Sequence, residues 1–267
     1  MAIKQFVPEF VKSFYHRTNW FFRNYGRINK FSELRSNHFY GPITYDSDGL
    51  STSTNADFIK EPRFAKAYAA AEATNPWPGF SLQWRVHVVC WAASQAAQLE
   101  GDFVECGVNT GAYARAIVDY IDFASRTKKF YLLDTFAGLV KDQISDKEKK
   151  AGIEEYLGSY RNVYDEVKKT FAPFSNVVLI QGMVPDTLPQ CQSTKIAYLS
   201  IDMNVVAPEI AAANYFWDKL VKGGIVVLDD YGFPQHINQK LAFDDFARQK
   251  KVEILALPTG QAIIIKP

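Results

Sequence analysis

A glycine-broken turn between two short apolar runs constrains the fold of this chain more than any other stretch. Residues 101–113 read Gly-Asp-Phe-Val-Glu-Cys-Gly-Val-Asn-Thr-Gly-Ala-Tyr, and the second apolar run ends at Asp134. The pattern predicts a buried strand at 103–106, a helix at 112–123 and a second strand at 129–133. Such an alternation begins an α/β fold with a parallel sheet, whose ligand lies beyond the carboxyl ends of the strands.

The turn between these strands differs from the dinucleotide-binding fingerprint. It reads Gly107-x-Asn109-x-Gly111 in place of G-x-G-x-x-G, and the acidic residue Glu105 stands just before it. An acid at this position repels a pyrophosphate but suits a ligand with a cationic group. S-adenosylmethionine is such a ligand, because it carries an ammonium group, a sulfonium and a ribose without phosphate. A nucleotide-dependent oxidoreductase is disfavoured for the same reason.

The rest of the chain continues the alternation of strands and helices. Besides the two strands above, we expect strands at 177–181, 196–201, 225–228, 252–257 and 262–266. The further predicted helices are 62–73, 80–99, 208–221 and 239–249, with a mostly helical segment at 141–171. The result is a mostly parallel sheet of seven strands that ends in an antiparallel C-terminal hairpin, which is the arrangement of Rossmann-like methyltransferases.

Residues 1–60 differ from the domain expected at 61–267, because basic and aromatic side chains alternate in them. One interpretation is an arm that contacts a partner, a membrane surface or an acidic substrate. The favoured one is an N-terminal helical extension whose aromatic residues pack on the core or on a second subunit. It predicts a homodimer formed through this region. Within the extension, residues 41–55 are expected to form a turn-rich linker.

Composition excludes several classes of protein. The net charge of +1 gives no indication of a nucleic-acid partner. The three cysteines are widely spaced among apolar neighbours, which predicts buried reduced thiols rather than disulfides or a metal site. Neither a signal peptide nor an apolar run of about 20 residues is recognisable. We therefore expect a cytoplasmic protein without a transmembrane segment.

Acidic residues end four of the predicted strands and should gather at one edge of the sheet. Asp134 is placed to accept hydrogen bonds from ribose hydroxyls, although an Asp followed by Thr135 is also typical of a helix N-cap. Asp202, Asp229 and Asp230 offer oxygen ligands of the kind that Mg²⁺ or Ca²⁺ prefers. Three converging carboxylates repel one another, so they require a cation. That cation is a divalent metal ion or, alternatively, a basic side chain such as Lys222 or Arg115.

The histidines are weaker candidates for chemistry. His236 follows the Asp229-Asp230 pair closely, and it is a candidate base or substrate contact. His87 lies inside a predicted helix, where a half-buried structural role is the more common one. His16 and His38 belong to no recognisable cluster of catalytic residues.

Six segments, taken in order, give the chain a specific resemblance. They are Trp84-Arg-Val-His87, Gly101–Gly107, Leu133-Asp-Thr-Phe-Ala-Gly-Leu139, Gly182-Met-Val-Pro-Asp-Thr-Leu-Pro189, Leu199-Ser-Ile-Asp-Met-Asn204 and Gly223–Tyr231. From about Phe80 to the C-terminus, the chain resembles the macrocin O-methyltransferase family, whose S-adenosylmethionine-dependent enzymes methylate sugar hydroxyls of macrolides and other glycosylated metabolites.

The resemblance implies a Rossmann-like class I methyltransferase fold and assigns roles to the residues named above. The methyl donor would lie over Glu105, Gly107 and Asp134, with Asn109, Gly111 and Thr135 beside it and Gln181, Gly182 and Met183 along the adenine. Mg²⁺ would be held by Asp202, Asp229 and Asp230 and would bind two neighbouring sugar oxygens. Family members are thought to use a histidine base after the second strand, but no histidine stands between His87 and His236. The base is therefore open between Asp202 and His236.

These inferences predict an S-adenosylmethionine-dependent, Mg²⁺-assisted O-methyltransferase. Its acceptor would be a hydroxyl of a small molecule or glycan, in particular a sugar or a glycosylated metabolite. Transfer of the methyl group to a catechol or another small phenol is the alternative, because a vicinal diol chelates a metal in either case. A non-catalytic ligand-binding protein on the same fold is a further alternative, which the three acidic residues disfavour.

Overall fold

The computed structural model describes residues 43–76 and 81–267. The chain divides into two compact units, of residues 1–56 with 77–81 and of residues 57–76 with 82–267. The predicted helical extension and the dimer contact through it fall mainly on residues 1–42, outside the described part. The predicted domains 1–60 and 61–267 stay a prediction.

The described part of the smaller unit contains a β-hairpin. Its strands are β1 (Tyr45–Ser47) and β2 (Leu50–Thr52), which pair antiparallel. The two turn residues, Asp48 and Gly49, have φ angles of 55° and 76°, which suits a tight hairpin turn. The hydroxyl of Ser47 also donates to the carbonyl of Ser81 over 2.8 Å. The turn-rich linker predicted at 41–55 does contain this turn, but the flanking residues pair as strands, because Asp-Gly between two short β-formers closes a hairpin.

The larger unit is built on a seven-stranded sheet in the order β5-β4-β3-β6-β7-β9-β8. Strands β3 to β7 run parallel, whereas β9 is antiparallel to both β7 and β8. The predicted sheet with its antiparallel C-terminal strands is confirmed. The strands are β3 (Asp102–Cys106), β4 (Phe130–Asp134), β5 (Val177–Gln181), β6 (Ile196–Ile201), β7 (Leu220–Leu228), β8 (Leu255–Ala256) and β9 (Ala262–Ile265).

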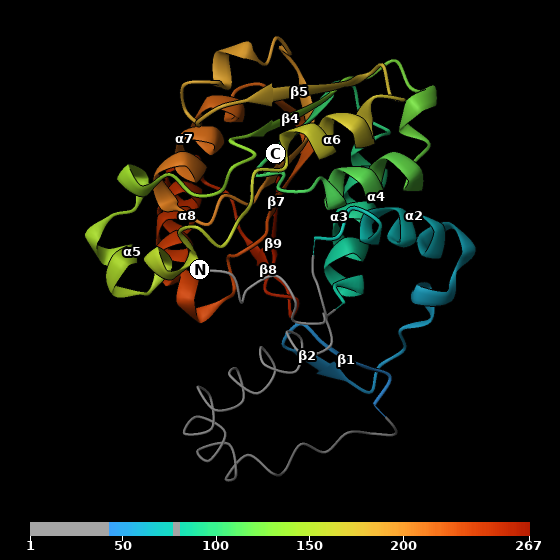
Figure 1. Cartoon of the computed structure of the whole chain (residues 1–267), viewed down its shortest axis with the longest axis horizontal. Coiled ribbons are helices and arrows are strands. Elements are labelled where there is room, and N and C mark those ends of the chain that lie inside the picture. The colour runs from blue at the N-terminus through green and yellow to red at the C-terminus, as the bar shows by residue number, and fades with distance from the viewer. Residues whose placement is uncertain (1–42, 77–80) are drawn as a thin grey trace, which may run out of the picture. The chain divides into compact units, whose positions relative to one another are not determined.

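Helices cover both faces of this sheet (Figure 1). On one side lie α2 (Pro62–Glu72), α3 (Gln83–Ala96) and α4 (Ala112–Tyr120), and on the other α7 (Val206–Trp217) and α8 (Ile237–Lys250). The shorter helices are α5 (Asp146–Lys150) and α6 (Tyr164–Phe171). Single 3₁₀ turns are found at Asp57–Lys60, Phe123–Ser125, Lys141–Gln143, Ile153–Tyr156, Leu188–Gln190 and Pro234–His236.

The core lies on both faces of the sheet, which explains why its central strands are apolar without alternation. All six residues of β6 are buried, and so are the last four of β3. Two of these buried residues, Glu105 and Ser200, are polar rather than apolar, and each is only 1% exposed. A buried acid in a central strand indicates a function, because burying an uncompensated polar group costs free energy.

Two stretches differ from the sequence expectation. The segment 141–171 is less helical than predicted, because Gly152 and Gly158 have φ angles of 92° and 74° and interrupt it. Strand β7 begins at Leu220 rather than at 225, so the two glycines lie inside the strand. A Cβ on Gly224 would lie 2.8 Å from the carbonyl oxygen of Val221, and the register with β6 shifts nearby. The glycines therefore accommodate an irregularity in the strand rather than a turn before it.

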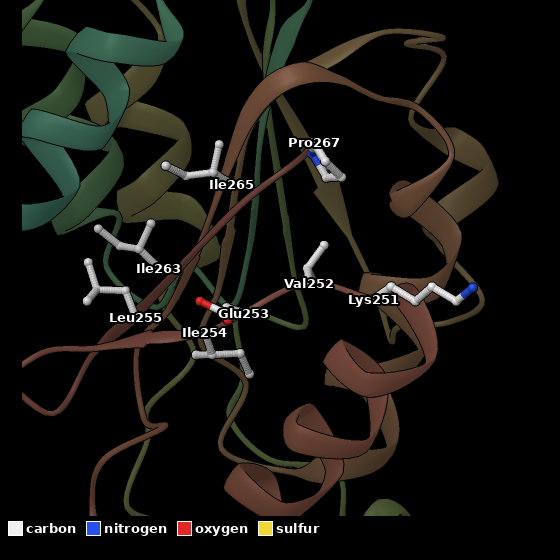
Figure 2. Close-up of a pocket in the computed structure, with 8 residues that line it drawn as sticks. All are labelled: Lys251, Val252, Glu253, Ile254, Leu255, Ile263, Ile265 and Pro267. Carbon is white, nitrogen blue, oxygen red and sulfur yellow. The ribbon is translucent and has the colours of Figure 1, made fainter.

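The outer edge of the sheet carries an apolar hollow of about 390 Å³. Figure 2 shows it beside the β8–β9 hairpin, where the side chains of Leu255, Ile263 and Ile265 lie on one side of it. None of the predicted site residues lines the hollow. Within the described residues, no helix is both long enough and apolar enough to cross a membrane.

Candidate functional site

The strand order reverses between β3 and β6, and this reversal positions the site. From β3 the chain builds β4 and β5 on one side and then returns to build β6 and β7 on the other. Ligands of open α/β sheets bind at such a reversal, beyond the carboxyl ends of the strands. The turn after β3 and the loop after β6 meet there. The backbone N–H of Asp202 donates to the carbonyl of Cys106 over 2.8 Å.

Gly107 is required by this close approach of two loops. Its φ is 88°, and a Cβ at this position would lie 1.7 Å from the carbonyl oxygen of Asp202. No side chain fits there without displacement of the backbone. Gly111 ends the same turn with a φ of 85° and stands directly before α4. Asn109, between the two glycines, also has a positive φ of 49°.

Asp134 holds the glycine turn in place. Its Oδ2 accepts the backbone N–H groups of Val108 and Asn109 over 2.5 and 2.7 Å. Its Oδ1 accepts the N–H of Phe136 over 2.6 Å and the hydroxyl of Thr135 over 3.2 Å. No α-helix of the described part begins here, so the N-cap interpretation was wrong. Tying the turn to the end of β4 is a role that the sequence reasoning missed.

Glu105 is the buried acid of the turn. Burial, together with the nearby carboxylates of Asp134 and Asp229, raises the pKa of Glu105 well above its usual value. Its Oε2 has no hydrogen-bond partner among the described residues. An unsatisfied buried acceptor costs about 1–3 kcal/mol, so a donor or cation from a ligand would stabilise it. The turn therefore fits a ligand that carries an ammonium group.

The segment that follows β5 completes this part of the edge. Gln181 pairs with Asp134 in the sheet register, and the N–H of Gly182 donates to the carbonyl of Asp134 over 2.9 Å. Met183 is 42% exposed, so its side chain is available to a ligand. The structure thus brings the sequence-predicted cofactor residues of three strand ends to one edge of the sheet.

The acidic cluster lies at the same edge. Asp202, Asp229 and Asp230 each offer a carboxylate oxygen, and these oxygens lie within 4.8 Å of one another. Burial and the charges of Asp229 and Asp230 raise the pKa of Asp202 well above its usual value. A set of three carboxylate oxygens with mutual repulsion fits a hard divalent cation such as Mg²⁺.

Asp229 has protein partners that sequence reasoning missed. Nη1 of Arg85, on α3, lies 2.7 Å from its Oδ2. Its Oδ1 accepts the hydroxyl of Tyr113 over 3.0 Å and the amide of Gln261 over 2.9 Å. A basic side chain does pair with the cluster, but it is Arg85 and neither Lys222 nor Arg115. Arg115 instead pairs with Asp119 over 2.6 Å.

A signal for Arg85 was present in the sequence, since the arginine stands inside a motif of the family resemblance. An arginine beside the apolar positions Val86 and Val89 of one helix needs a buried acidic partner. Three of the roughly four lone-pair positions on the Asp229 carboxylate are used by protein donors. Asp202 and Asp230 consequently supply most of the remaining capacity for a metal ion.

His236 lies at this edge as well. The residue is buried, and its Nε2 is 3.9 Å from Oδ2 of Asp230. The ring of Tyr156 is nearly parallel to the imidazole, with ring centres 6.3 Å apart. His87 lies elsewhere, stacked on Phe58 with ring centres 4.0 Å apart. His16 and His38 fall outside the described residues.

Aromatic side chains of the segment 141–163 lie near the acidic cluster. Burial and the carboxylates of Asp202 and Asp230 raise the pKa of Tyr160. Tyr160 also packs on Gly138, where a Cβ would lie 2.8 Å from its own Cβ. Trp84 packs edge-on against Phe58 with ring centres 4.6 Å apart. Tyr156 and Tyr160 therefore join Tyr113 as aromatic residues of the described chain beside the acidic cluster.

Several solved structures that superpose on this chain are named methyltransferases. The O-methyltransferase NovP superposes with a TM-score of 0.61 at 20% identity, covering 74% of this chain and 88% of NovP. The calicheamicin methyltransferase CalS11 gives 0.58 at 17% identity, covering 84% and 98%. The S-adenosylhomocysteine-bound Podospora anserina methyltransferase PaMTH1 gives 0.52 at 14%, covering 79% and 92%. The fold is thus that of the class I methyltransferases.

The sequence gives the assignment within this class. A family model described as macrocin O-methyltransferase (TylF) matches residues 83–256, which is more than half of the chain. The chain belongs to the macrocin O-methyltransferase family. It is accordingly an O-methyltransferase of the S-adenosylmethionine-dependent type. Comparison with curated proteins gave no significant match.

Proposed function

We propose that this enzyme methylates a hydroxyl of a sugar or glycosylated small molecule with the assistance of a divalent metal ion, Mg²⁺. The observation that carries the proposal is the contact between Gly107 and the backbone of Asp202. This contact connects the glycine turn, which suits the methyl donor, with the acidic cluster, which suits a metal ion. The family name refers to macrocin, and the similar protein CalS11 is named a calicheamicin methyltransferase.

The residues proposed to hold the methyl donor surround the glycine turn. S-adenosylmethionine supplies a methyl group on a sulfonium, which makes the carbon an electrophile. Glu105 would compensate the cationic end of the donor, and Asp134 would hold the turn in position. The other members of the set are Gly107, Asn109, Gly111, Thr135, Gln181, Gly182 and Met183.

The proposed metal ligands are Asp202, Asp229 and Asp230. Mg²⁺ held by these residues would lower the pKa of the acceptor hydroxyl and orient it. Asp229 is held by Arg85, which fixes the position of one ligand. Tyr156 and Tyr160 are placed to contact the acceptor, since aromatic faces pack well on the apolar side of a sugar ring.

The acceptor hydroxyl must lose a proton as its oxygen bonds to the methyl carbon. The carbon–sulfur bond breaks with its electron pair on sulfur, so the positive charge passes from the sulfonium to the protonated base. Asp202 and His236 are the candidates for this base. Two observations support His236 as this base. Its Nε2 lies 3.9 Å from Oδ2 of Asp230. Unlike Asp202, it is not one of the proposed metal ligands, so a metal ion would not occupy its proton-accepting atom.

A catechol or small-phenol acceptor remains the second candidate, since it would use the same three carboxylates. We also propose a homodimer formed through residues 1–60 and a cytoplasmic location. These two proposals rest on the sequence alone.

The first test is calorimetry of S-adenosylmethionine with the purified protein in excess Mg²⁺, followed by an acceptor screen read by mass spectrometry. We expect binding that Asp134→Asn weakens, because an amide cannot accept all the N–H groups of the turn. A methylated nucleotide sugar or glycoside, lost on chelation of the metal, would support the proposal. Methylation of catechols alone would favour the alternative, and a folded protein that binds no donor would contradict both.

A further inference from the structure

A chain of buried polar side chains leads from α7 to the acidic edge, and the proposed reaction involves only its last member, His236. Glu209 on α7, Gln239 on α8 and His236 just before α8 are 3%, 3% and 4% exposed. His236 and Gln239 are three positions apart, so both side chains lie on one face of the helix start. When buried polar side chains contact one another in a row, the hydrogen bonds between them fix the orientation of each side chain.

Three hydrogen bonds connect these residues. The backbone N–H of Met203 donates to Oε1 of Glu209 over 2.9 Å. The amide nitrogen Nε2 of Gln239 donates to the same oxygen over 2.7 Å. Oε1 of Gln239 forms a hydrogen bond with Nδ1 of His236.

The orientation of the Gln239 amide determines the direction of the last bond. Oε1 of Glu209 accepts both the N–H of Met203 and the NH₂ of Gln239. With its NH₂ directed at Glu209, Gln239 has its carbonyl oxygen facing the imidazole. A carbonyl oxygen can only accept, so Nδ1 of His236 carries the hydrogen.

A neutral imidazole with its hydrogen on Nδ1 has a lone pair on Nε2. That atom is the one 3.9 Å from Oδ2 of Asp230, a distance beyond a hydrogen bond. The ring of Tyr156 is nearly parallel to the imidazole, with ring centres 6.3 Å apart. The proton-accepting atom is therefore directed at the acidic cluster.

We propose that Glu209 and Gln239 are positioning residues that fix the tautomer of His236, with hydrogen on Nδ1 and the lone pair on Nε2. This inference rests on the proposed function for its catalytic consequence. In that reaction, Nε2 takes the proton of the acceptor hydroxyl, whose electron pair stays on the oxygen that bonds to the methyl carbon. The imidazolium that results keeps its Nδ1–H bond to Gln239, which stabilises it.

The tautomer can be read directly by two-bond ¹H–¹⁵N correlation spectra of protein labelled with ¹⁵N-histidine. The chain has four histidines, and the spectrum of His236→Gln identifies the signals of His236 by their absence. At a pH where the ring is neutral, we expect a protonated-type shift for Nδ1 and an unprotonated-type shift for Nε2. Hydrogen on Nε2 in the wild type overturns the proposal, whatever the variants do.

Substitutions of Gln239 and Glu209 distinguish a role in positioning His236 from a purely structural role in packing. Gln239→Met keeps the length of the side chain but removes the acceptor, so we expect loss of the Nδ1–H tautomer. Glu209→Gln keeps an oxygen that can accept both N–H groups, so we expect it to retain the tautomer. Gln235→Met is the matched control, because Gln235 is an exposed glutamine immediately before His236. We expect no change in its spectrum.

Activity provides the second readout. Loss of a partner that orients a functional imidazole typically costs about 10–100-fold. We expect Gln239→Met to lower kcat by that factor with an unchanged KM for the methyl donor, and Glu209→Gln to stay within about threefold. An unchanged kcat in a Gln239→Met protein that has lost the tautomer overturns the positioning role. Absence of methyl transfer by the wild type with every acceptor contradicts the proposed function, while the spectra still decide the tautomer.

Discussion

At the scale of single residues, the site is organised by a cation from the protein itself. The Arg85 guanidinium lies 2.7 Å from Asp229 while two further carboxylates stand close by. A buried ion pair of this kind contributes little net free energy compared with apolar residues, but loss of one partner leaves a buried charge. The main consequence of removing Arg85 is therefore the unpaired buried charge that it leaves on Asp229.

We predict that Arg85→Met lowers the free energy of unfolding by about 3 kcal/mol near neutral pH, because the Asp229 charge then lacks its cation. Urea denaturation with an unchanged m-value measures the loss. Arg115→Met is the control, since its pair with Asp119 joins neighbouring turns of α4. It should cost only about 0.5 kcal/mol. Equal losses in the two variants would contradict the special role of Arg85.

Glu209 gives the molecule a pH dependence. Burial, with the charge of Asp230, raises the pKa of Glu209 to about 8 from a usual value of 4.5. Between these values the folded state binds more protons than the unfolded state. The contribution to stability is therefore fully present below pH 4.5 and is lost as the pH rises through 8.

We predict that the wild type loses about 2 kcal/mol more than Glu209→Gln when the pH is raised from 6 to 8, because the variant has no carboxyl to ionise. Chemical denaturation of both proteins at the two pH values gives the comparison. Parallel losses in wild type and variant would show that Glu209 does not titrate in this range.

At the scale of structural elements, close contacts between loops determine the geometry of the site more than the helices do. The glycine turn after β3 lies against the loop after β6 at Gly107. We predict that Gly107→Ala weakens S-adenosylmethionine binding at least about tenfold, because a Cβ would displace the Asp202 backbone. Calorimetry of the donor measures this effect. Gly158→Ala is the matched control, since its φ is also positive but no atom lies within 4 Å of a Cβ there.

Gly158→Ala should bind the donor as the wild type does and lose only about 1 kcal/mol of stability from backbone strain. If Gly107→Ala behaved in the same way, strain alone would explain its effect, and the loop contact would not be important for donor binding.

The elements that could be predicted from the sequence are those whose signal is local. Strands 177–181 and 196–201 were predicted with the bounds that the structure gives. Their continuous apolar residues belong to a sheet covered on both faces. Strand β7 was predicted too short, because Gly223-Gly224 has the local signature of a turn and only the neighbouring strands keep it extended. Segment 141–171 was predicted too helical, since charged residues suit a helix but its glycines do not.

The partners of Asp229 show why a site is harder to predict than a fold. Arg85, Tyr113 and Gln261 come from α3, α4 and the loop before β9, which are separated by up to 176 positions. No spacing rule connects them. The predicted strand-end acids gather as expected, because the carboxyl ends of parallel strands must lie at one edge. For a side chain that reaches this edge from a helix, such as Arg85, the sequence motif indicates at most that the residue needs a partner and does not identify that partner.

At the scale of the whole molecule, the acidic edge should couple metal binding to stability. A metal ion that binds only the folded state stabilises it by about 2.7 kcal/mol at one hundred times its dissociation constant. We predict that Mg²⁺ raises the midpoint of thermal unfolding of the wild type and that Asp202→Asn reduces the increase. Differential scanning fluorimetry with and without chelator measures it. An equal increase in Asp202→Asn would assign the metal to other residues.

Glu148 has a consequence for which acceptors the enzyme can admit. Its carboxylate caps α5 through Ser145, and its Oε1 also accepts the N–H of Val206 over 2.7 Å, at the start of α7. The segment that carries Tyr156 and Tyr160 is thereby fastened to the loop that leaves Asp202. Ile144 and Ile153 of the same segment also pack against Val205 in one buried cluster. In the proposed reaction, an acceptor bulky enough to push α5 outward would therefore displace the loop that carries Asp202, so the size of the acceptor and the position of this proposed metal ligand are linked.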